Sequence, residues 1–294
     1  MTGFAYHAPT SVAETLALLG DHARAGRRAQ VLAGGTDVLV QLRGVDRTPR
    51  ALVDIKGLAE VNRLHVGADH VFIGAAIPSA QLNENAELTR WYPGLMEAAD
   101  LIGSTQIQGR ASVGGNLCNA SPAGDTIPAL IAVGAKCVIA TASGTRELPV
   151  EAFVTGVGRN ALVAGELLLG LSLPRPGPAT ADAYLRFTPR TEMDIAVAGC
   201  GVSVTLDANG ACTAARVGIG AVAPTALLVE AAAAALVGTR LDDAALTAAG
   251  AACSAAASPI TDKRGTADYR RKVVGVLCRR AAAIARDRAL AHRA

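Results

Sequence analysis

The sequence predicts an α+β protein with two domains, on three observations. The 294 residues are 51% hydrophobic and 18% charged, so the chain can bury more than one core. Short strand-like and helix-like runs fill the first 175 residues, and the segment 173–181 that follows carries three prolines and a glycine. Beyond this linker, strands give way to alanine-rich runs with helical spacing. We therefore expect domains at 1–175 and 176–294, with subdomains at 1–56 and 57–175.

The first subdomain reads as a small α/β unit. Ser11 precedes an apolar helical run and Glu14 follows three residues later, which is the spacing of a helix capping box. The run AQVLAGG at 29–35 predicts a short strand that ends at glycine, and residues 51–55 predict another. In the second subdomain, the sequence predicts mostly short strands and turns between Val61 and Leu173, with a helix across 95–102.

In the C-terminal domain, the sequence predicts a strand meander followed by helices. Asn209-Gly210 lies between two β-prone runs and favours a hairpin turn. Three alanine-rich segments, at 225–237, 242–257 and 267–290, repeat apolar residues at helical spacing. An α+β domain is therefore expected here.

Composition excludes several functional classes. A net charge of +3 and an aromatic content of 3% argue against nucleic-acid binding. A basic cluster near the C-terminus is better explained by a solvated helix face or a subunit contact: Arg270, Arg271, Lys272, Arg279 and Arg280. The N-terminus lacks the pattern of a signal peptide, and no segment is apolar enough to span a membrane. The sequence thus predicts a soluble, cytoplasmic protein.

The six cysteines are spread singly, with no Cys-x-x-Cys pair and no Cys/His cluster. The spacing therefore predicts no metal site and no iron–sulfur cluster in this chain. No nucleophile–base motif such as G-x-S-x-G occurs either. We expect no catalytic side chain and no metal ligand.

Two glycine pairs carry the strongest functional signal. Gly34-Gly35 and Gly114-Gly115 each offer unobstructed backbone N–H groups, which suits an anion bound from more than one direction. Neutral hydrogen-bonding side chains flank them: Thr36, Ser112, Asn116 and Asn119. The G-x-G-x-x-G and G-x-x-x-x-G-K-[ST] motifs are absent, so a Rossmann fold and a P-loop are disfavoured.

With their flanks, AGGTDVLVQLR from Ala33 and SVGGNLCNASPAGD from Ser112 resemble the paired FAD-binding signatures of molybdenum hydroxylase flavoprotein subunits. These are the medium subunits of carbon monoxide dehydrogenase-like and xanthine dehydrogenase-like enzymes. The segments YLRFTPRTEMDIAVAG and YRRKVVGVLCRRA resemble C-terminal landmarks of the same family. The resemblance covers the whole chain and implies an FAD-binding domain of the PCMH type.

The resemblance implies a set of cofactor-binding residues. Two segments would wrap the FAD pyrophosphate and ribityl chain: Val31, Leu32, Ala33, Gly34, Gly35, Thr36, Asp37 and Val38, and Ala111, Ser112, Gly114, Gly115 and Asn116. Five more would lie near the flavin or adenine: Ile102, Asn119, Asp125, Leu168 and Arg186. Since no histidine or cysteine occupies a loop typical of covalent attachment, we expect non-covalent FAD.

Three residues depart from the family pattern: Ser112 and Asn160 replace threonines, and Arg186 replaces a lysine. Other roles stay open for some positions. Asp125 precedes an apolar run, so it can cap a helix instead of contacting flavin. Arg186 can form a surface ion pair, and Asp194 with Arg190 can join the two domains or face the flavin.

The resemblance implies an electron-transfer subunit of a heteromeric oxidoreductase. Electrons would pass from [2Fe-2S] clusters of a small subunit through FAD to an external acceptor. Molybdopterin would be held by a large subunit, in a dimer of heterotrimers. Two alternatives remain from the sequence: a stand-alone FAD-dependent oxidoreductase, or a non-catalytic nucleotide-binding module.

Overall fold

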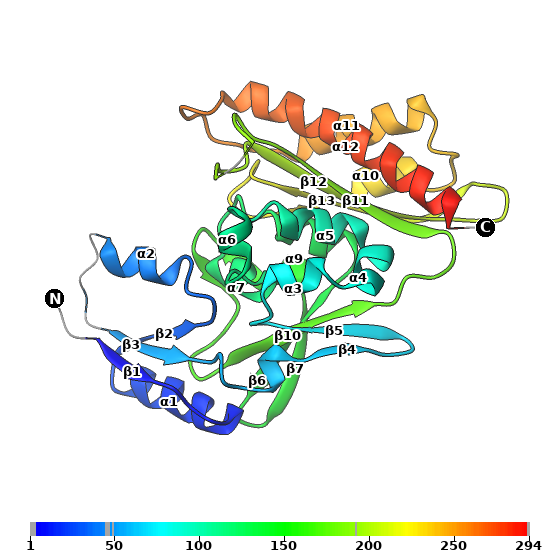
Figure 1. The fold of residues 1–294 in the computed structure, drawn as a ribbon. Helices are drawn as coiled ribbons and strands as arrows, with labels where there is room; N and C mark the ends of the chain where they lie inside the picture. The colour runs from blue at the N-terminus through cyan, green and yellow to red at the C-terminus, as the bar shows by residue number, and fades with distance from the viewer. Residues whose placement is uncertain (1–3, 45–47, 49, 192, 293–294) are drawn as a thin grey trace.

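The computed structural model describes residues 4–44, 48, 50–191 and 193–292. Figure 1 shows the helices α10 to α12 over one sheet, a middle group of short helices beneath it, and further sheets below. We call β1 to β10 the N-terminal region and β11 to α12 the C-terminal region. The structure confirms the predicted α+β class.

The first sheet is parallel and has the order β1-β3-β2, with β1 at Ala5–His7, β2 at Arg28–Leu32 and β3 at Arg50–Asp54. Helix α1 (Val12–Arg24) begins as predicted, because Ser11 Oγ accepts a hydrogen bond from the Glu14 N–H. The Glu14 carboxylate reaches the N–H of Thr10 at 2.8 Å instead of that of Ser11, so the predicted capping box closes one residue earlier. Helix α2 (Val38–Arg43) follows β2.

The second sheet is antiparallel, with the order β4-β5-β10-β6-β7. The expected hairpins are present: β4 (Leu64–Val66) with β5 (His70–Gly74), and β6 (Lys136–Thr141) with β7 (Gly144–Pro149). Strand β10 (Leu167–Pro174) lies between β5 and β6 and ends in the linker. A small hairpin of β8 (Val154–Gly156) and β9 (Arg159–Asn160) precedes it.

Short helices fill much of the segment predicted to be mostly strands and turns, so that prediction was wrong. They are η1 (Glu60–Asn62), α3 (Ser79–Asn83), α4 (Ala86–Trp91), α5 (Pro93–Asp100), α6 (Thr105–Gln108), α7 (Val113–Asn119), α8 (Thr126–Ala132) and α9 (Val150–Phe153). Only the helices near 95–102 and after Asp125 were foreseen. The others are too short for a helical hydrophobic period to stand out, and tertiary packing maintains them.

The C-terminal region is the predicted meander with helices on one face. Its strands pair in chain order: β11 (Thr180–Phe187), β12 (Ala198–Leu206), β13 (Cys212–Gly220) and β14 (Leu227–Leu228). Helices α10 (Glu230–Leu236), α11 (Asp243–Ala256) and α12 (Ala267–Ala291) cover it. The first helix is shorter than expected, because residues 227–228 join the sheet. Strands β10 and β11 also extend into both ends of the expected linker.

The basic cluster is not uniformly a solvated helix face. Arg270 is 3% exposed, donates to the Val197 carbonyl at 2.9 Å and pairs with Asp262 at 2.7 Å. The expectation was wrong for Arg270 because this side chain fastens α12 to the sheet. Within the described residues, every helix is too short or too polar to cross a membrane.

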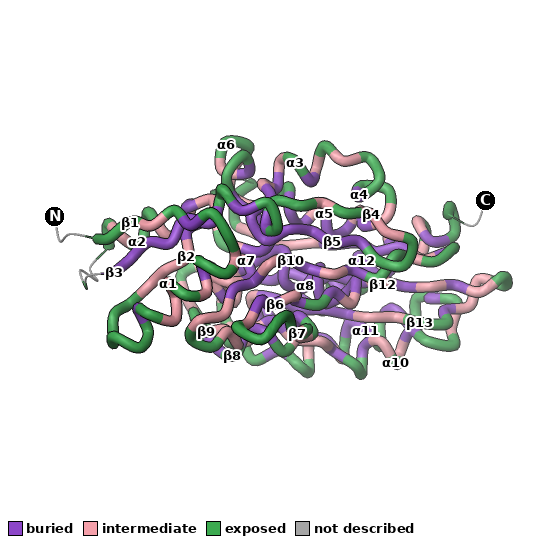
Figure 2. The backbone as a smooth tube through the Cα atoms, turned by 90° about the horizontal axis from the view of Figure 1, so that it is seen from below, coloured by how far each residue is buried: buried purple, intermediate pink, exposed green. Residues whose placement is uncertain are grey.

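The two regions meet where the sheet of the C-terminal region packs on α5 and α8. Helix α8 is buried along its length, and Figure 2 shows buried chain running through the middle of the molecule. Backbones touch there: a Cβ on Gly201 would lie 2.7 Å from the Pro128 carbonyl oxygen, and one on Gly94 would lie 2.6 Å from Ala183 Cα. The contact is therefore close-packed.

Polar groups also join the two regions. The Asp182 carboxylate accepts the Leu95 N–H at 2.9 Å, at the start of α5. Glu97, two residues after Leu95, accepts the Tyr184 N–H at 3.1 Å and a hydrogen bond from Arg288 of α12. Strand β11 is thus fixed to α5 by both backbone and side-chain bonds.

Candidate functional site

A cavity of about 700 Å³ lies within the N-terminal region, between the first sheet, α7 and the start of β10. Fifteen predicted site residues line it: Val31, Ala33, Gly34, Gly35, Thr36, Asp37, Val38, Ile102, Ala111, Ser112, Gly114, Gly115, Asn116, Asn119 and Leu168. Folding thus brings both glycine pairs, far apart in the sequence, to one cavity.

The first glycine pair lies between β2 and α2. A Cβ on Gly34 would overlap the Arg110 carbonyl oxygen, so this glycine lets the two loops touch. Gly35 has φ = 80°, in the left-handed region that favours glycine. Two separate constraints therefore explain the pair, and both shape the cavity wall.

The second glycine pair lies in the first turn of α7. A Cβ on Gly114 would lie 2.5 Å from the Ala75 carbonyl oxygen, so this residue packs against the chain after β5. A Cβ on Gly115 would meet only Ser112 Oγ, at 3.0 Å. Ser112 caps α7 by accepting the Gly115 N–H at 3.0 Å. Gly115 therefore leaves the cavity side open.

A chain of side-chain hydrogen bonds connects the walls of the cavity. Arg50 of β3 donates to Gln30 at 3.0 Å, Gln30 donates to Gln41 at 2.6 Å, and Gln41 donates to Asn119 at 3.1 Å. These bonds link the first sheet through α2 to α7. They also orient side-chain amide groups, and these amides can exchange their mutual hydrogen bonds for hydrogen bonds to a ligand.

Charged groups at the cavity carry both signs. Arg28 and Arg50, paired in register on β2 and β3, line it together with Asp37. Burial raises the pKa of the Asp37 carboxyl. Asp37 occupies the N-cap position of α2 but makes no capping hydrogen bond.

Two asparagines have structural partners that explain their positions. Asn116 accepts the Thr126 hydroxyl at 2.7 Å, which ties α7 to α8. Asn160 donates to the Cys118 carbonyl at 3.0 Å and accepts the Leu162 N–H at 3.1 Å. Asn160 therefore joins the β9 strand to α7.

Three predicted site residues do not line the cavity: Leu32, Asp125 and Arg186. Leu32 is 8% exposed and belongs to the core. Asp125 and Arg186 form an ion pair of 2.8 Å, with side chains 10% and 6% exposed, so the surface ion pair expected for Arg186 is buried instead. This pair connects α8 to β11.

The structure contradicts the helix-cap role considered for Asp125. Asp125 stands at the N-cap position of α8, but its backbone is already helical and its side chain makes no capping bond. Its carboxylate instead accepts the Tyr184 hydroxyl at 2.9 Å and pairs with Arg186. Burial raises the pKa of Asp125, and the Arg186 guanidinium acts against that rise.

Asp194 has partners within the C-terminal region. It pairs with Arg264 at 3.1 Å and with Arg190 at 3.7 Å. The hydrogen bond from the Ile195 backbone N–H is the main cause that lowers the pKa of Asp194, and the hydrogen bond from Arg264 is the next. Neither Asp194 nor Arg190 lines the cavity, and these pairs do not cross to the N-terminal region.

Sequence reasoning missed further lining residues: Arg28, Ala29, Gln30, Gln41, Arg50, Ile55, Ala75, Cys118, Gly158, Asn160, Leu162 and Leu167. Most belong to strands or strand ends away from the glycine motifs. Arg28 and Gln30 carry a weak signal, since polar residues at alternate positions place one face of a strand away from an apolar core.

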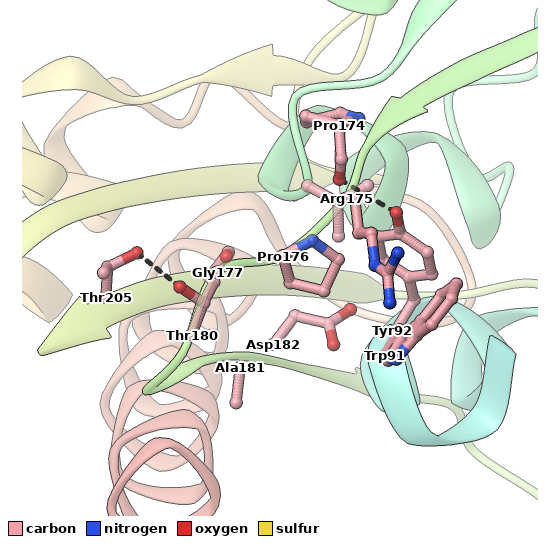
Figure 3. A pocket seen from close by; sticks show the side chains of 12 residues that line it. Trp91, Tyr92, Pro174, Arg175, Pro176, Gly177, Thr180, Ala181, Asp182 and Thr205 are labelled. Carbon is pink, nitrogen blue, oxygen red and sulfur yellow. Dashed lines mark hydrogen bonds between the residues drawn. The ribbon is translucent and has the colours of Figure 1, made fainter. Parts of the chain in front are cut away.

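A second, smaller cavity of about 200 Å³ lies where the two regions join (Figure 3). Arg175 lies over the Trp91 ring at 4.5 Å, and the Tyr92 hydroxyl donates to the Pro174 carbonyl at 2.8 Å. Asp182 Oδ1 has no hydrogen-bond partner there, and burial raises the pKa of Asp182 to about 7. This cavity is too small for a dinucleotide.

Comparisons with known proteins identify the family of the chain. Residues 2–176 match the FAD binding domain in molybdopterin dehydrogenase, and residues 183–285 match the CO dehydrogenase flavoprotein C-terminal domain. The chain is 34% identical over 287 residues to the carbon monoxide dehydrogenase medium chain of Afipia carboxidovorans, covering 97% of this chain and 98% of that one.

Two further relatives extend this result. The xanthine dehydrogenase FAD-binding subunit of Escherichia coli O157:H7 is 35% identical, over 75% of this chain and 74% of that one. The solved carbon monoxide dehydrogenase of Hydrogenophaga pseudoflava superposes with a TM-score of 0.90 at 34% identity, over 97% of this chain and 98% of that one. With a family match over more than half its length, the chain belongs to the FAD-binding subunits of the molybdenum hydroxylase family, which are oxidoreductase subunits.

Proposed function

We propose that this chain binds FAD non-covalently in the 700 Å³ cavity and relays electrons within a heteromeric molybdenum hydroxylase. The observation that carries the proposal is the meeting of both glycine loops at one cavity. Its volume lies in the range of about 300–1,000 Å³ typical of cofactor sites. The proposed domains stay at 1–175 and 176–294, with subdomains 1–56 and 57–175, supported by the separate sheets.

The residues present fit FAD. Gly115 leaves a space that any side chain would fill, and the backbone can approach a pyrophosphate closely there. Arg28 and Arg50 supply positive charge, while Asn119 and Gln41 supply amide groups. The flavin would supply the redox chemistry, and the protein supplies binding, orientation and electrostatics.

The partners belong to the same proposal. Relatives carry the names of medium chains and FAD-binding subunits, which supports the view that this chain works beside other subunits. We propose a small subunit with [2Fe-2S] clusters as electron donor and a large subunit with molybdopterin, in a dimer of heterotrimers. An external acceptor would take the electrons from the flavin.

The first test is a visible absorption spectrum of the purified chain, with chromatography of any cofactor released by heat. We expect stoichiometric FAD that is released intact, since the proposal is non-covalent. A colourless chain that does not take up added FAD would overturn the proposal. If the chain stays yellow after denaturation and releases no flavin, only the non-covalent part of the proposal is overturned.

A pair of variants then locates the site. Gly115→Trp should abolish FAD retention and leave the far-ultraviolet circular dichroism unchanged, because the indole would occupy the open cavity side. The matched control is Gly57→Trp, at an exposed glycine with nothing within 4 Å of an added Cβ. Full FAD retention by Gly115→Trp would show that the cofactor lies elsewhere.

A further inference from the structure

Three cysteines that are far apart in the sequence meet inside the C-terminal region. Cys200 belongs to β12, Cys253 to α11 and Cys278 to α12. Their Sγ atoms all lie within 4.8 Å of one another, and each residue is 0% exposed. Sequence spacing predicts no metal site, because no two of these cysteines are near neighbours. The fold creates a cluster that the spacing conceals.

The approach of α11 to α12 explains why the thiols converge. A Cβ on Gly250 of α11 would lie 2.6 Å from the Gly275 carbonyl oxygen of α12, so the helices touch at backbone distance. Cys253 and Cys278 each follow their glycine by three residues, which keeps them on nearly the same helix face. Cys200 packs in the same core cluster, on the sheet beneath the helices.

We propose that Cys200, Cys253 and Cys278 form a three-coordinate site for one soft, monovalent metal ion, with Cu(I) as the representative ion. Soft sulfur ligands, thiolate above all, select Cu(I). Structural zinc sites use four ligands, and among the described residues this cluster offers three. The proposed site is distinct from the FAD cavity and does not depend on it.

Charge balance sets how many protons an ion displaces from this apolar core, where a net buried charge is costly. Three thiols take up one Cu(I), one S–H bond breaks, and one proton leaves to solvent. The product has one thiolate, two thiols and one Cu(I), so its net charge is zero, like that of the three thiols. A divalent ion would have to displace two protons to keep the same neutral charge.

The test is an anaerobic titration of the full chain with Cu(I), in competition with the chelator bathocuproine disulfonate. We expect one tightly held ion per chain and release of about one proton per ion, as charge balance requires. Cys253→Ala and Cys278→Ala should each weaken binding at least about 100-fold, since each removes a ligand. The controls are Cys137→Ala and Cys212→Ala, buried cysteines outside the cluster, which should keep the wild-type affinity.

Thermal unfolding provides a second measurement in the same proteins. Cu(I) should raise the melting temperature of the wild type and leave that of Cys278→Ala unchanged, because a ligand that binds only the folded state stabilises it. Alanine suits these helices, so the variants are expected to fold; a Cys253→Ser variant gives a second test if they do not.

Several results would overturn the proposal. These are no uptake in competition with the chelator, equal uptake by the cluster variants, or dependence on the partly exposed Cys118. Zn(II) binding as tightly as Cu(I) would contradict the argument from coordination number. Loss of FAD binding in Gly115→Trp should leave Cu(I) binding unchanged, so the two sites can fail separately.

Discussion

Glycine serves different purposes at the cavity and at the contact between the two regions. At the contact, a Cβ on Gly94 or Gly201 would strike backbone atoms of the facing element, so the missing side chain allows close packing. At the cavity, a Cβ on Gly115 would meet only the Ser112 hydroxyl, so the missing side chain provides room. The two uses have opposite consequences for substitution: one should affect stability and the other ligand binding.

The same difference occurs within the second glycine pair. Gly114 packs against Ala75 as tightly as the contact glycines do, whereas its neighbour Gly115 borders open space. A doubled glycine therefore joins a packing requirement to a binding requirement. Three substitutions at the contact between the regions test this contrast. We expect each to change stability and to leave FAD affinity unchanged.

Asp125→Ala should have the largest effect. It leaves Arg186 buried without its carboxylate, a change that costs about 3 kcal/mol of unfolding free energy. Urea unfolding at pH 7 measures it. Asp21→Ala, which breaks an ion pair between side chains 61% and 74% exposed, is the control and should cost under about 1 kcal/mol. A fall in FAD affinity in folded Asp125→Ala, beyond that in the control, would show that the contact and the cavity are not independent.

Gly201→Ala should follow. Its Cβ would lie 2.7 Å from the Pro128 carbonyl oxygen and 2.9 Å from Ala129 Cα, so α8 must shift at a cost of about 2 kcal/mol. Differential scanning calorimetry measures the loss. Gly177→Ala, where an added Cβ has Thr180 Oγ1 at 3.9 Å, is the control. Equal melting temperatures for the two variants would refute close packing as the reason for this glycine.

Asp182→Asn should have the smallest effect, and one that depends on pH. Because burial raises the pKa of Asp182 to about 7 in the folded protein, folding favours the protonated form. Its contribution to stability is full below the unfolded pKa, near 4, and is lost as pH rises through 7. From pH 6 to pH 8, the wild type should lose about 1 kcal/mol relative to Asp182→Asn. Parallel stability curves for the two proteins over this range would contradict the assignment.

Much of the fold could be predicted from local sequence. Ser11 caps its helix, Gly210 has φ = 81° in the expected hairpin turn, and the long C-terminal helices lie where the helical spacing predicts them. Each of these signals depends on a few neighbouring residues. The short helices between β5 and β6 have no comparable local signal, because their stability comes from packing against the sheets.

The candidate site shows the same division. The residues predicted from the two glycine motifs make up about half of the cavity lining, since their sequence is specific on its own. Asp125 and Arg186, which the resemblance assigns to the flavin, form an ion pair across the contact between regions, and this pairing had no local signal. Gln41 and Arg50 were missed because their roles come from a hydrogen-bond chain between separate elements. Such pairings cannot be predicted before the fold is known.

The position of the cavity in chain order has a consequence for biosynthesis. Every lining residue falls between Arg28 and Leu168, ahead of the linker and of β11. Since domains fold as units and the N-terminal one emerges first from the ribosome, the cavity can be completed on the nascent chain. The face of α5 and α8 stays uncovered until the C-terminal region is translated. Cofactor loading would then stabilise the N-terminal region during the interval in which its apolar face is most exposed to aggregation.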